Sequence, residues 1–208
     1  VKKFIYSSSG SVYGIKKEKK VTEELPPYPI SVYNKTKMIA ERVLLSFKDK
    51  IDIQIVRPAT VCGLSPRMRL DVSVNLLSIQ ALEKKVITIF GGEQKRPNIH
   101  IVDLTNVFIY FLENKVKNGI YNAGFENLSI LKIGQIIQKS IDCKIKIKKN
   151  NDSRSYNLDS TKLLSTGFLP KYSILDAINE IKSSFAEKKL RSKPQWYSVK
   201  WLKSIKVI

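Results

Sequence analysis

The feature that most constrains this chain is the stretch from Phe4 to Lys37. An apolar segment with strand character, Phe4–Tyr6, runs into the letters SSSGSVYG at positions 7–14. A polar, proline-rich loop follows, and then a helix that carries Tyr33 and Lys37. Residues four apart lie on one face of a helix, so these two side chains are expected to lie together.

The pair formed by Tyr33 and Lys37 indicates proton-transfer chemistry. A free tyrosine loses its proton only at about pH 10, which makes it a poor base in neutral solution. A cation one helical turn away stabilises the phenolate, so that Tyr33 becomes suited to exchange protons at about pH 7. Together with a serine hydroxyl at the strand end, the pair suits moving a proton on or off a hydroxyl while hydride leaves the carbon.

Each part of this pattern also has a structural explanation. A tyrosine and a lysine four apart are most often surface residues, and triple serines are common in loops. The ordered combination of strand, SSSGSVYG, loop and YNKTK from Tyr33 is far more specific. It resembles the active-site region of the extended short-chain dehydrogenase/reductase superfamily, in particular the NAD-dependent epimerase/dehydratase family that acts on nucleotide sugars. The resemblance continues through RPATVCG at 57–63, RPNIHIVD at 96–103 and RSYNLD at 154–159.

The resemblance implies an α/β fold, with the C-terminal part of a Rossmann-type doubly wound parallel sheet and a smaller mixed α/β substrate-binding domain. Residues 1–62 are expected in the Rossmann part and 63–190 in the substrate-binding domain, of which about 98–124 packs back on the Rossmann part. Residues 191–208 form a basic-aromatic tail that the resemblance does not cover. It either packs along its own domain, which is favoured, or binds a membrane surface or partner.

Hydrophobic patterning favours the same fold class. Ile51–Val56 reads as a buried strand after the Tyr33 helix, and strand, helix, strand in this order argues for a parallel sheet. Ligand sites lie off the carboxyl ends of such strands, where Ser9 and Ala59–Thr60 are expected. Further helices are expected at 70–85, 104–113 (capped by Asp103), 130–140 (capped by Ser129) and 174–189, with strands at 86–90, 119–124 and 144–148.

The resemblance also implies roles for individual residues. Tyr33 is expected as general base and acid, Ser9 as a donor to the sugar oxygen, and Lys37 as a ligand of the nicotinamide ribose. Ser7 and Ala59 are expected at the nicotinamide end of NAD.

Substrate contacts are expected from Ser9 and from a second set of residues. Arg96 and Arg154 are expected to clamp a diphosphate, because a planar guanidinium binds phosphate in two places; surface ion pairing is the alternative. Thr60 lies at the strand end, and Asn75 aligns more loosely with a family asparagine near the diphosphate. The sole histidine, His100, is expected to be structural, and no metal is expected.

One detail distinguishes between reactions in this family. Dehydratases and decarboxylases usually carry an acidic residue just after the catalytic Ser or Thr, which serves proton transfer to or from the sugar. Gly10 and Ser11 stand at these positions and cannot do so. Epimerisation or simple keto reduction is therefore favoured over dehydration.

The formal charge of +19 raises a different class of function, because basic proteins attract nucleic-acid backbones. The excess of positive charge is almost all lysine, spread from Lys2 to Lys206. Proteins that read base edges in the DNA grooves instead concentrate arginine on one element. A solvated lysine surface is favoured over a nucleic-acid footprint. A basic interaction or nucleic-acid-binding protein without catalysis remains the alternative, and salt-dependent retention on DNA would favour it.

Other features concern the surroundings of the protein. There is no run of about eighteen apolar residues, so no membrane span is expected. The two cysteines, Cys62 and Cys143, lack a partner spacing, which fits a reducing cytoplasm. Cys62 is expected to be a small buried hydrophobe. A homodimer through the helix carrying Tyr33 is possible.

The family seats the dinucleotide pyrophosphate on a Gly-x-x-Gly-x-x-Gly turn at a helix N-terminus, in roughly the first hundred residues. No such turn follows a first strand in this sequence, which therefore resembles the C-terminal two-thirds of an enzyme. We expect the 208-residue chain by itself to bind NAD more weakly than micromolar, because these contacts are lacking. Calorimetric titration with NAD measures this, and a micromolar dissociation constant contradicts it.

Overall fold

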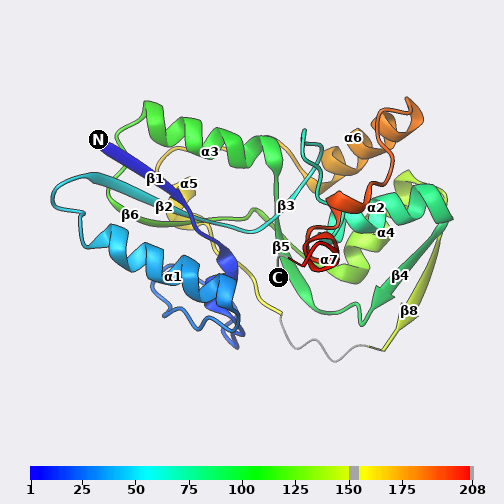
Figure 1. Cartoon of the computed structure of the whole chain (residues 1–208), viewed down its shortest axis with the longest axis horizontal. Helices are drawn as coiled ribbons and strands as arrows, with labels where there is room; N and C mark the ends of the chain where they lie inside the picture. Colours follow the sequence, from blue (N-terminus) through cyan, green and yellow to red (C-terminus); the bar gives the residue numbers. More distant parts are fainter. Residues whose placement is uncertain (150–154, 207–208) are drawn as a thin grey trace.

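Within the described residues there are three small sheets: two belong to α/β halves that lie side by side, and the third lies between them (Figure 1). The computed structural model describes residues 1–149 and 155–206. The strands are β1 (Lys3–Ser7), β2 (Asp52–Pro58), β3 (Thr60–Cys62), β4 (Val86–Phe90), β5 (Lys95–His100), β6 (Gly119–Ala123), β7 (Glu126–Ser129) and β8 (Lys144–Lys148). The α-helices are α1 (Val32–Leu45), α2 (Ser73–Lys84), α3 (Ile101–Glu113), α4 (Ile130–Ser140), α5 (Thr161–Leu164), α6 (Ile174–Ala186) and α7 (Ser198–Ser204). Two short 3-10 helices are η1 (Gly10–Tyr13) and η2 (Pro194–Trp196).

The first half is a parallel sheet in the order β1-β2-β6, with Ser7 opposite Val56 and Val56 opposite Tyr121. Helix α1 lies on one face and α3 on the other (Figure 1). Its core includes Val56, Val107 and Phe111, and the ring of Phe111 meets that of Tyr121 edge to face at 5.1 Å. Helices on both faces of a parallel sheet make this half doubly wound, which confirms the expected fold class.

The second half joins parallel strands β4 and β8 to helices α2, α4 and α6. Apolar side chains from strand and helices form its core, among them Ile87, Ile89, Ile133 and Ile178. Between the halves lies the third sheet, β3-β5-β7, in which β3 and β5 are parallel and β7 is antiparallel. The third sheet is therefore mixed, whereas β4 and β8 of the second half are parallel.

The chain passes between the halves more than once. Strand β6 belongs to the first sheet, and α5 contacts β6, so that Leu163 and Phe168 are buried in the same cluster as Val56. The backbone also forms a single parallel bridge between Val21 and Leu158. The division of the chain at residues 62 and 190 stays a proposal.

Most expected elements are present. The N-termini of two helices test the caps predicted from the sequence. Ser129 caps α4 by accepting a hydrogen bond from Lys132 N–H at 3.1 Å. The expected cap at Asp103 is wrong, because α3 begins at Ile101 and its cap is His100, whose Nδ1 accepts from Val102 N–H at 3.2 Å.

Asp103 serves a tertiary contact instead. Its buried carboxylate accepts hydrogen bonds from the backbone N–H groups of Lys171 (3.0 Å) and Tyr172 (2.9 Å), in a segment distant in sequence. Helix α3 also begins earlier than expected and exposes Leu112, although its composition is apolar on most positions. The short strands β3 and β7 carry too few residues to show a pattern in the sequence.

The C-terminal segment packs on its own chain, as favoured from the sequence. Leu70 N–H donates to the carbonyl of Trp196 at 2.8 Å, and Trp196 and Tyr197 pack against a cluster that contains Met68. In the part of the chain that the structure describes, no helix is long and apolar enough to cross a membrane.

We expect Ile133→Ala to lower the free energy of unfolding by about 2–5 kcal/mol, because it leaves a cavity in the core of the second half. Ile147→Ala is the matched control: that side chain is 59% exposed on β8, and its loss should cost less than about 0.5 kcal/mol. Urea denaturation monitored by circular dichroism measures both. Equal effects of the two substitutions would contradict the described packing.

Candidate active site

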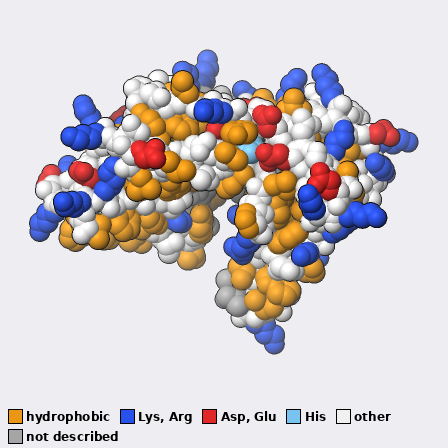
Figure 2. Space-filling model, turned by 90° about the horizontal axis from the view of Figure 1, so that it is seen from above, with side chains coloured by type: hydrophobic (Ala, Val, Ile, Leu, Met, Phe, Trp, Pro, Cys, Tyr) orange, Lys and Arg blue, Asp and Glu red, His pale blue; other side chains and the backbone are white. Residues whose placement is uncertain are grey.

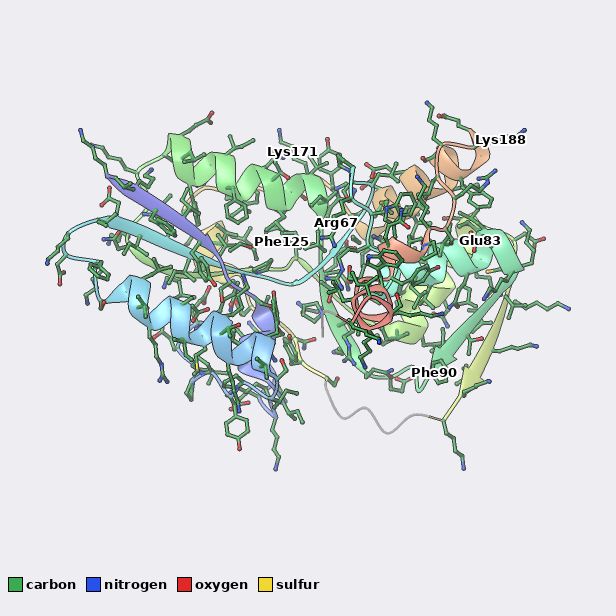
Figure 3. The ribbon with its side chains drawn as sticks, in the orientation of Figure 1. Arg67, Glu83, Phe90, Phe125, Lys171 and Lys188 are labelled. Atoms are coloured by element: carbon green, nitrogen blue, oxygen red, sulfur yellow. The ribbon has the colours of Figure 1, made fainter. Side chains whose placement is uncertain are left out.

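A cleft of about 870 Å³ lies where the two halves meet. It brings together most of the residues singled out in the sequence. Those lining it are Ser7, Ser9, Tyr33, Lys37, Ala59, Thr60 and Asn75, together with Ser8, Ser11, Pro58, Val61, Cys62, Gly63, Ser65, Arg67, Arg69, Val72, Ile101, Leu104, Tyr156 and Val199. Figure 3 shows Arg67 between the two halves.

The cleft opens at the carboxyl ends of β1 and β2. These strands are parallel and in register, and Ser8 N–H extends the ladder by donating to Val56 O at 2.8 Å. The chain then turns into η1, which Ser9 caps. At the neighbouring strand end, Ala59 N–H donates to Ala123 O at 2.8 Å. Two loops from adjacent strand ends thus face one cleft, as expected for a parallel sheet.

The Ser9 hydroxyl belongs to a short chain of hydrogen bonds that reaches the Tyr33 helix. Ser9 Oγ and Ser11 Oγ lie 2.7 Å apart, and Ser11 Oγ donates to Asn34 Oδ1 at 2.7 Å. Because the proton of Ser11 is used toward the amide oxygen, Ser9 is left to donate to Ser11. Rotation of the Ser9 hydroxyl would free this proton for a ligand oxygen in the cleft.

Lys37 is fixed at the cleft by the end of the neighbouring strand. Its ammonium donates to the carbonyl of Ser7 at 2.7 Å and lies 4.9 Å from the centroid of the Tyr6 ring. The centroid of the Tyr33 ring is 5.8 Å away, and Tyr33 is 55% exposed. A positive charge therefore lies one helical turn from an accessible phenol, on the face that the spacing predicts.

A buried ion pair holds this helix to the sheet. Glu41 of α1 accepts two hydrogen bonds from Arg57 of β2, from Nε at 2.9 Å and from Nη2 at 2.6 Å. Glu41 also accepts from the hydroxyl of Ser8, and both charged residues are at most 2% exposed. The pair joins α1, β2 and the serine loop beneath the cleft.

Tyr13 lies behind Arg57 and is not a second candidate base. The guanidinium stacks on its ring at 4.7 Å, and the phenol donates to Asn122 Oδ1 at 2.8 Å. Burial raises the pKa of Tyr13 to about 12, although the positive charge of Arg57 acts in the opposite direction. This tyrosine stays protonated and serves as a structural hydrogen-bond donor.

The loop after β3 is held from the inside by Asn75, which is 3% exposed. Its amide accepts from Gly63 N–H at 3.1 Å and donates to the carbonyl of Arg69 at 3.0 Å. Gly63 has a φ of +106°, and a Cβ there would lie 2.9 Å from Nε2 of His100. His100 lies 3.3 Å from Glu180, which also accepts from Leu64 N–H at 3.3 Å. His100 is thus part of the packing under the loop.

The arginines of the cleft differ from those expected. Arg67 and Arg69 line it, whereas Arg96 lies on β5, donates to the carbonyl of Lys95 at 3.1 Å and is not among the lining residues. Arg154 lies outside the described residues. Arg96 was singled out as an arginine in a lysine-rich chain that also opens the motif RPNIHIVD. Arg67 and Arg69 are arginines in the same chain, but no motif marks them.

Arg69 is partly neutralised by a neighbour. Its Nε lies 3.0 Å from Asp71 Oδ1, and the side chain of Arg69 is 51% exposed. Among the described residues, no carboxylate lies within salt-bridge distance of Arg67, so its guanidinium provides positive charge at this end of the cleft. Together they favour an anionic ligand.

Cys62 lines the cleft but lacks the character of a nucleophile. Burial raises the pKa of its thiol to about 12, and the carboxylates of Glu126 and Glu180 act in the same direction. It is 1% exposed and remains a protonated apolar side chain. Within residues 1–149 and 155–206, no group of three His, Cys, Asp or Glu side chains is placed to hold a metal ion.

A serine, a tyrosine and a lysine that meet at the carboxyl ends of parallel strands define a site of the short-chain dehydrogenase type. A sequence profile of the NAD dependent epimerase/dehydratase family matches residues 1–124, more than half of the chain. The chain belongs to this family.

Individual relatives agree with this assignment. The chain is 34% identical over 143 residues to an uncharacterised UDP-glucose epimerase, YtcB, of Bacillus subtilis strain 168, covering 66% of this chain and 44% of that protein. It is 28% identical over 208 aligned residues to the UDP-glucose 4-epimerase of Lactobacillus helveticus, covering 86% of this chain and 62% of the relative.

Among solved structures, that of UDP-glucuronic acid 4-epimerase from Bacillus cereus, in complex with UDP-glucuronic acid and NAD, superposes with a TM-score of 0.74. The identity is 32%, over 87% of this chain and 62% of that one. The chain thus spans less than two thirds of the length of each of these relatives.

We expect Glu41→Ala to lower the free energy of unfolding by about 3–5 kcal/mol, because it leaves the charge of Arg57 buried and unpaired. Glu187→Ala is the control, since it breaks the exposed pair with Lys189, whose atoms lie 2.7 Å apart. That change should leave the free energy almost unchanged. Thermal and urea unfolding of the two variants, compared with the parent chain, measure the difference; a mild effect of Glu41→Ala would argue against a buried pair.

Proposed function

We propose that this chain supplies the catalytic and substrate-binding part of an NAD-dependent nucleotide-sugar epimerase. The observation that carries the proposal is the convergence of Ser9, Tyr33 and Lys37 on one cleft at the ends of β1 and β2. Relatives named as UDP-glucose and UDP-glucuronic acid 4-epimerases support the nucleotide-sugar class.

Tyr33 would act as general base and acid. Its accessible phenol takes the proton of a sugar hydroxyl, while the ammonium of Lys37, 5.8 Å from the ring centroid, stabilises the negative charge. Ser9 donates a hydrogen bond to the same oxygen once its hydroxyl turns away from Ser11. After the oxidised sugar has rotated in the cleft, Tyr33 would return the proton to the same oxygen.

Ser7, Lys37 and Ala59 fit the nicotinamide end of NAD. The Lys37 ammonium is anchored on the Ser7 carbonyl, and Ala59 lies in the cleft wall beside them. When bound, NAD supplies the acceptor and the donor of the hydride. No glycine-rich strand-turn-helix is present among residues 1–149 and 155–206, so the contacts proposed for this chain are those to the nicotinamide and its ribose.

For the substrate we propose Ser9 and Thr60 near the sugar and arginines near the anionic groups. Arg67 and Arg69 line the cleft, and Arg96 and Arg154 remain candidate diphosphate ligands on the strength of the resemblance.

Asn75 also lines the cleft and stays a substrate-binding candidate. Its amide already bonds to Gly63 and Arg69, so it also fixes the loop that presents the arginines.

Epimerisation is proposed over dehydration because the cleft side of the serine loop carries no acid. Gly10 and Ser11 follow Ser9, and the Ser11 hydroxyl is already bonded to Asn34. A dehydratase or keto-reductase of the same family is the alternative. A basic nucleic-acid-binding protein is the alternative of another class, but Lys and Arg side chains are scattered over the face seen in Figure 2 and form no single stripe.

Two further proposals concern the surroundings of the enzyme. Helix α1 exposes Val32, Ile39 and Val43, which favours a homodimer through this helix. The two cysteines are buried and unpaired, which is compatible with the reducing cytoplasm.

The reaction is tested with the chain fused behind the N-terminal part of the Bacillus cereus enzyme, whose structure contains NAD. UDP-glucose and UDP-glucuronic acid serve as substrates, and proton NMR identifies the products. An epimer without loss of water is the expected result. A dehydrated keto sugar, or net consumption of NADH, would instead assign the dehydratase or the keto-reductase.

In this fusion protein we expect Tyr33→Phe to lower kcat by about 10²–10⁴-fold, because the group that exchanges the proton is lost. The affinity for UDP should change by less than about threefold, since the phenol acts on the sugar. Tyr28→Phe is the matched control, because Tyr28 is 70% exposed and outside the cleft lining. Equal kcat values for the two variants would remove Tyr33 from the mechanism.

A further inference from the structure

The C-terminal segment 194–204, which comprises η2 and α7, lies beyond the residues that the family profile matches and borders the cleft. In Figure 1 α7 is drawn between the two halves, in front of the third sheet. Val199 of α7 is one of the lining residues and is 54% exposed. An apolar side chain of this segment therefore forms part of the wall of the proposed active site.

The same segment holds the loop that carries the two cleft arginines. Leu70 N–H donates to the carbonyl of Trp196 at 2.8 Å. Met68 and Leu70, which flank Arg69, are at most 2% exposed and pack with Trp196 and Tyr197. Arg67 and Arg69 alternate in sequence with Met68 and Leu70. The direction of the arginine side chains therefore depends on Met68 and Leu70 staying buried.

One carboxylate connects the segment to an arginine directly. Asp71 accepts from Val199 N–H with Oδ2 at 3.4 Å, and it pairs with Arg69 Nε through Oδ1 at 3.0 Å. The backbone carbonyl of Arg69 is held from the opposite side by Asn75. Arg69 is thus held by Asn75 of α2 at its backbone and by Asp71 at its side chain, and Asp71 in turn accepts a hydrogen bond from the backbone of α7.

From these contacts we propose that the segment 194–204 is a wall of the substrate cleft and a positioning element for Arg67 and Arg69. It sets the affinity of the site for the anionic part of a nucleotide ligand. The inference rests on the proposed function for the identity of that ligand, but not for the contacts between the segment and the loop.

A charge introduced at position 199 tests the wall. The probe is UDP, titrated calorimetrically into the purified 208-residue chain, with uridine as the uncharged reference. We expect Val199→Glu to weaken UDP binding at least about tenfold, because its carboxylate repels the diphosphate and competes for Arg67 and Arg69. Val199→Lys, of similar length, should leave UDP binding within about threefold or tighten it, and neither change should alter uridine binding as strongly.

Two outcomes of these titrations would contradict the expected effects on UDP binding. Equal effects of glutamate and lysine, or no effect of either on UDP binding, would place Val199 outside the ligand site and overturn the inference. A difference that is equally large for uridine would also overturn it, because the effect would then not act on the anionic group.

Hydrogen exchange separates the inference from the proposed function. If the parent chain binds neither UDP nor uridine, the proposed ligand is wrong, and the positioning role is judged by amide exchange in the loop 64–72. Deletion of 192–208 should speed exchange there at least about tenfold, while peptides of β1 and β2 stay unchanged.

Val199→Pro provides a variant that keeps the fold intact, because proline is tolerated in the first turn of a helix while it removes the N–H donated to Asp71. It should speed exchange in the same loop. Unchanged exchange in both variants would overturn the positioning role.

Discussion

The carboxylate of Glu41 and the guanidinium of Arg57 form a buried ion pair on which the geometry of the cleft depends. The pair connects the helix that carries Tyr33 and Lys37 to the central strand of the first sheet, and Ser8 joins it from the serine loop. Burying two charges is costly unless geometry and additional hydrogen bonds compensate. Here the two-point contact and the Ser8 hydroxyl provide part of that compensation, while Nη1 of Arg57 is buried without a hydrogen-bond partner among the described residues. The pair thereby ties α1 and the serine loop to β2.

The second constraint is the loop between β3 and α2. It is tied to Asn75 from the inside, to Glu180 of α6 at Leu64, and to the C-terminal segment at Leu70. The first half thus provides the groups suited to proton transfer, and the second half provides the groups suited to anions. A ligand that spans the cleft would contact both halves, as the nucleotide sugar proposed above would do.

Much of the fold and part of the site could be predicted from the sequence. Strands such as Asp52–Pro58 and the cap at Ser129 are local features with a clear pattern, and the spacing of Tyr33 and Lys37 placed both on one face of α1. The cap expected at Asp103 was wrong because that carboxylate satisfies the backbone of Lys171 and Tyr172, a contact that no local pattern can reveal. Arg67 and Arg69 were not singled out because no motif marks them, and their place in the cleft wall follows only from the fold.

The sequence alone determined the α/β class and the family resemblance, and it predicted Ser9 after a strand and Tyr33 and Lys37 on the next helix, because periodicity and motif spacing are encoded over short distances. Only the tertiary structure decided that the serine loop is bonded to Asn34, that Glu41 lies buried against Arg57, and that the C-terminal segment forms a wall of the cleft. These contacts join residues far apart in the chain, and they follow from how complete helices and strands pack against each other.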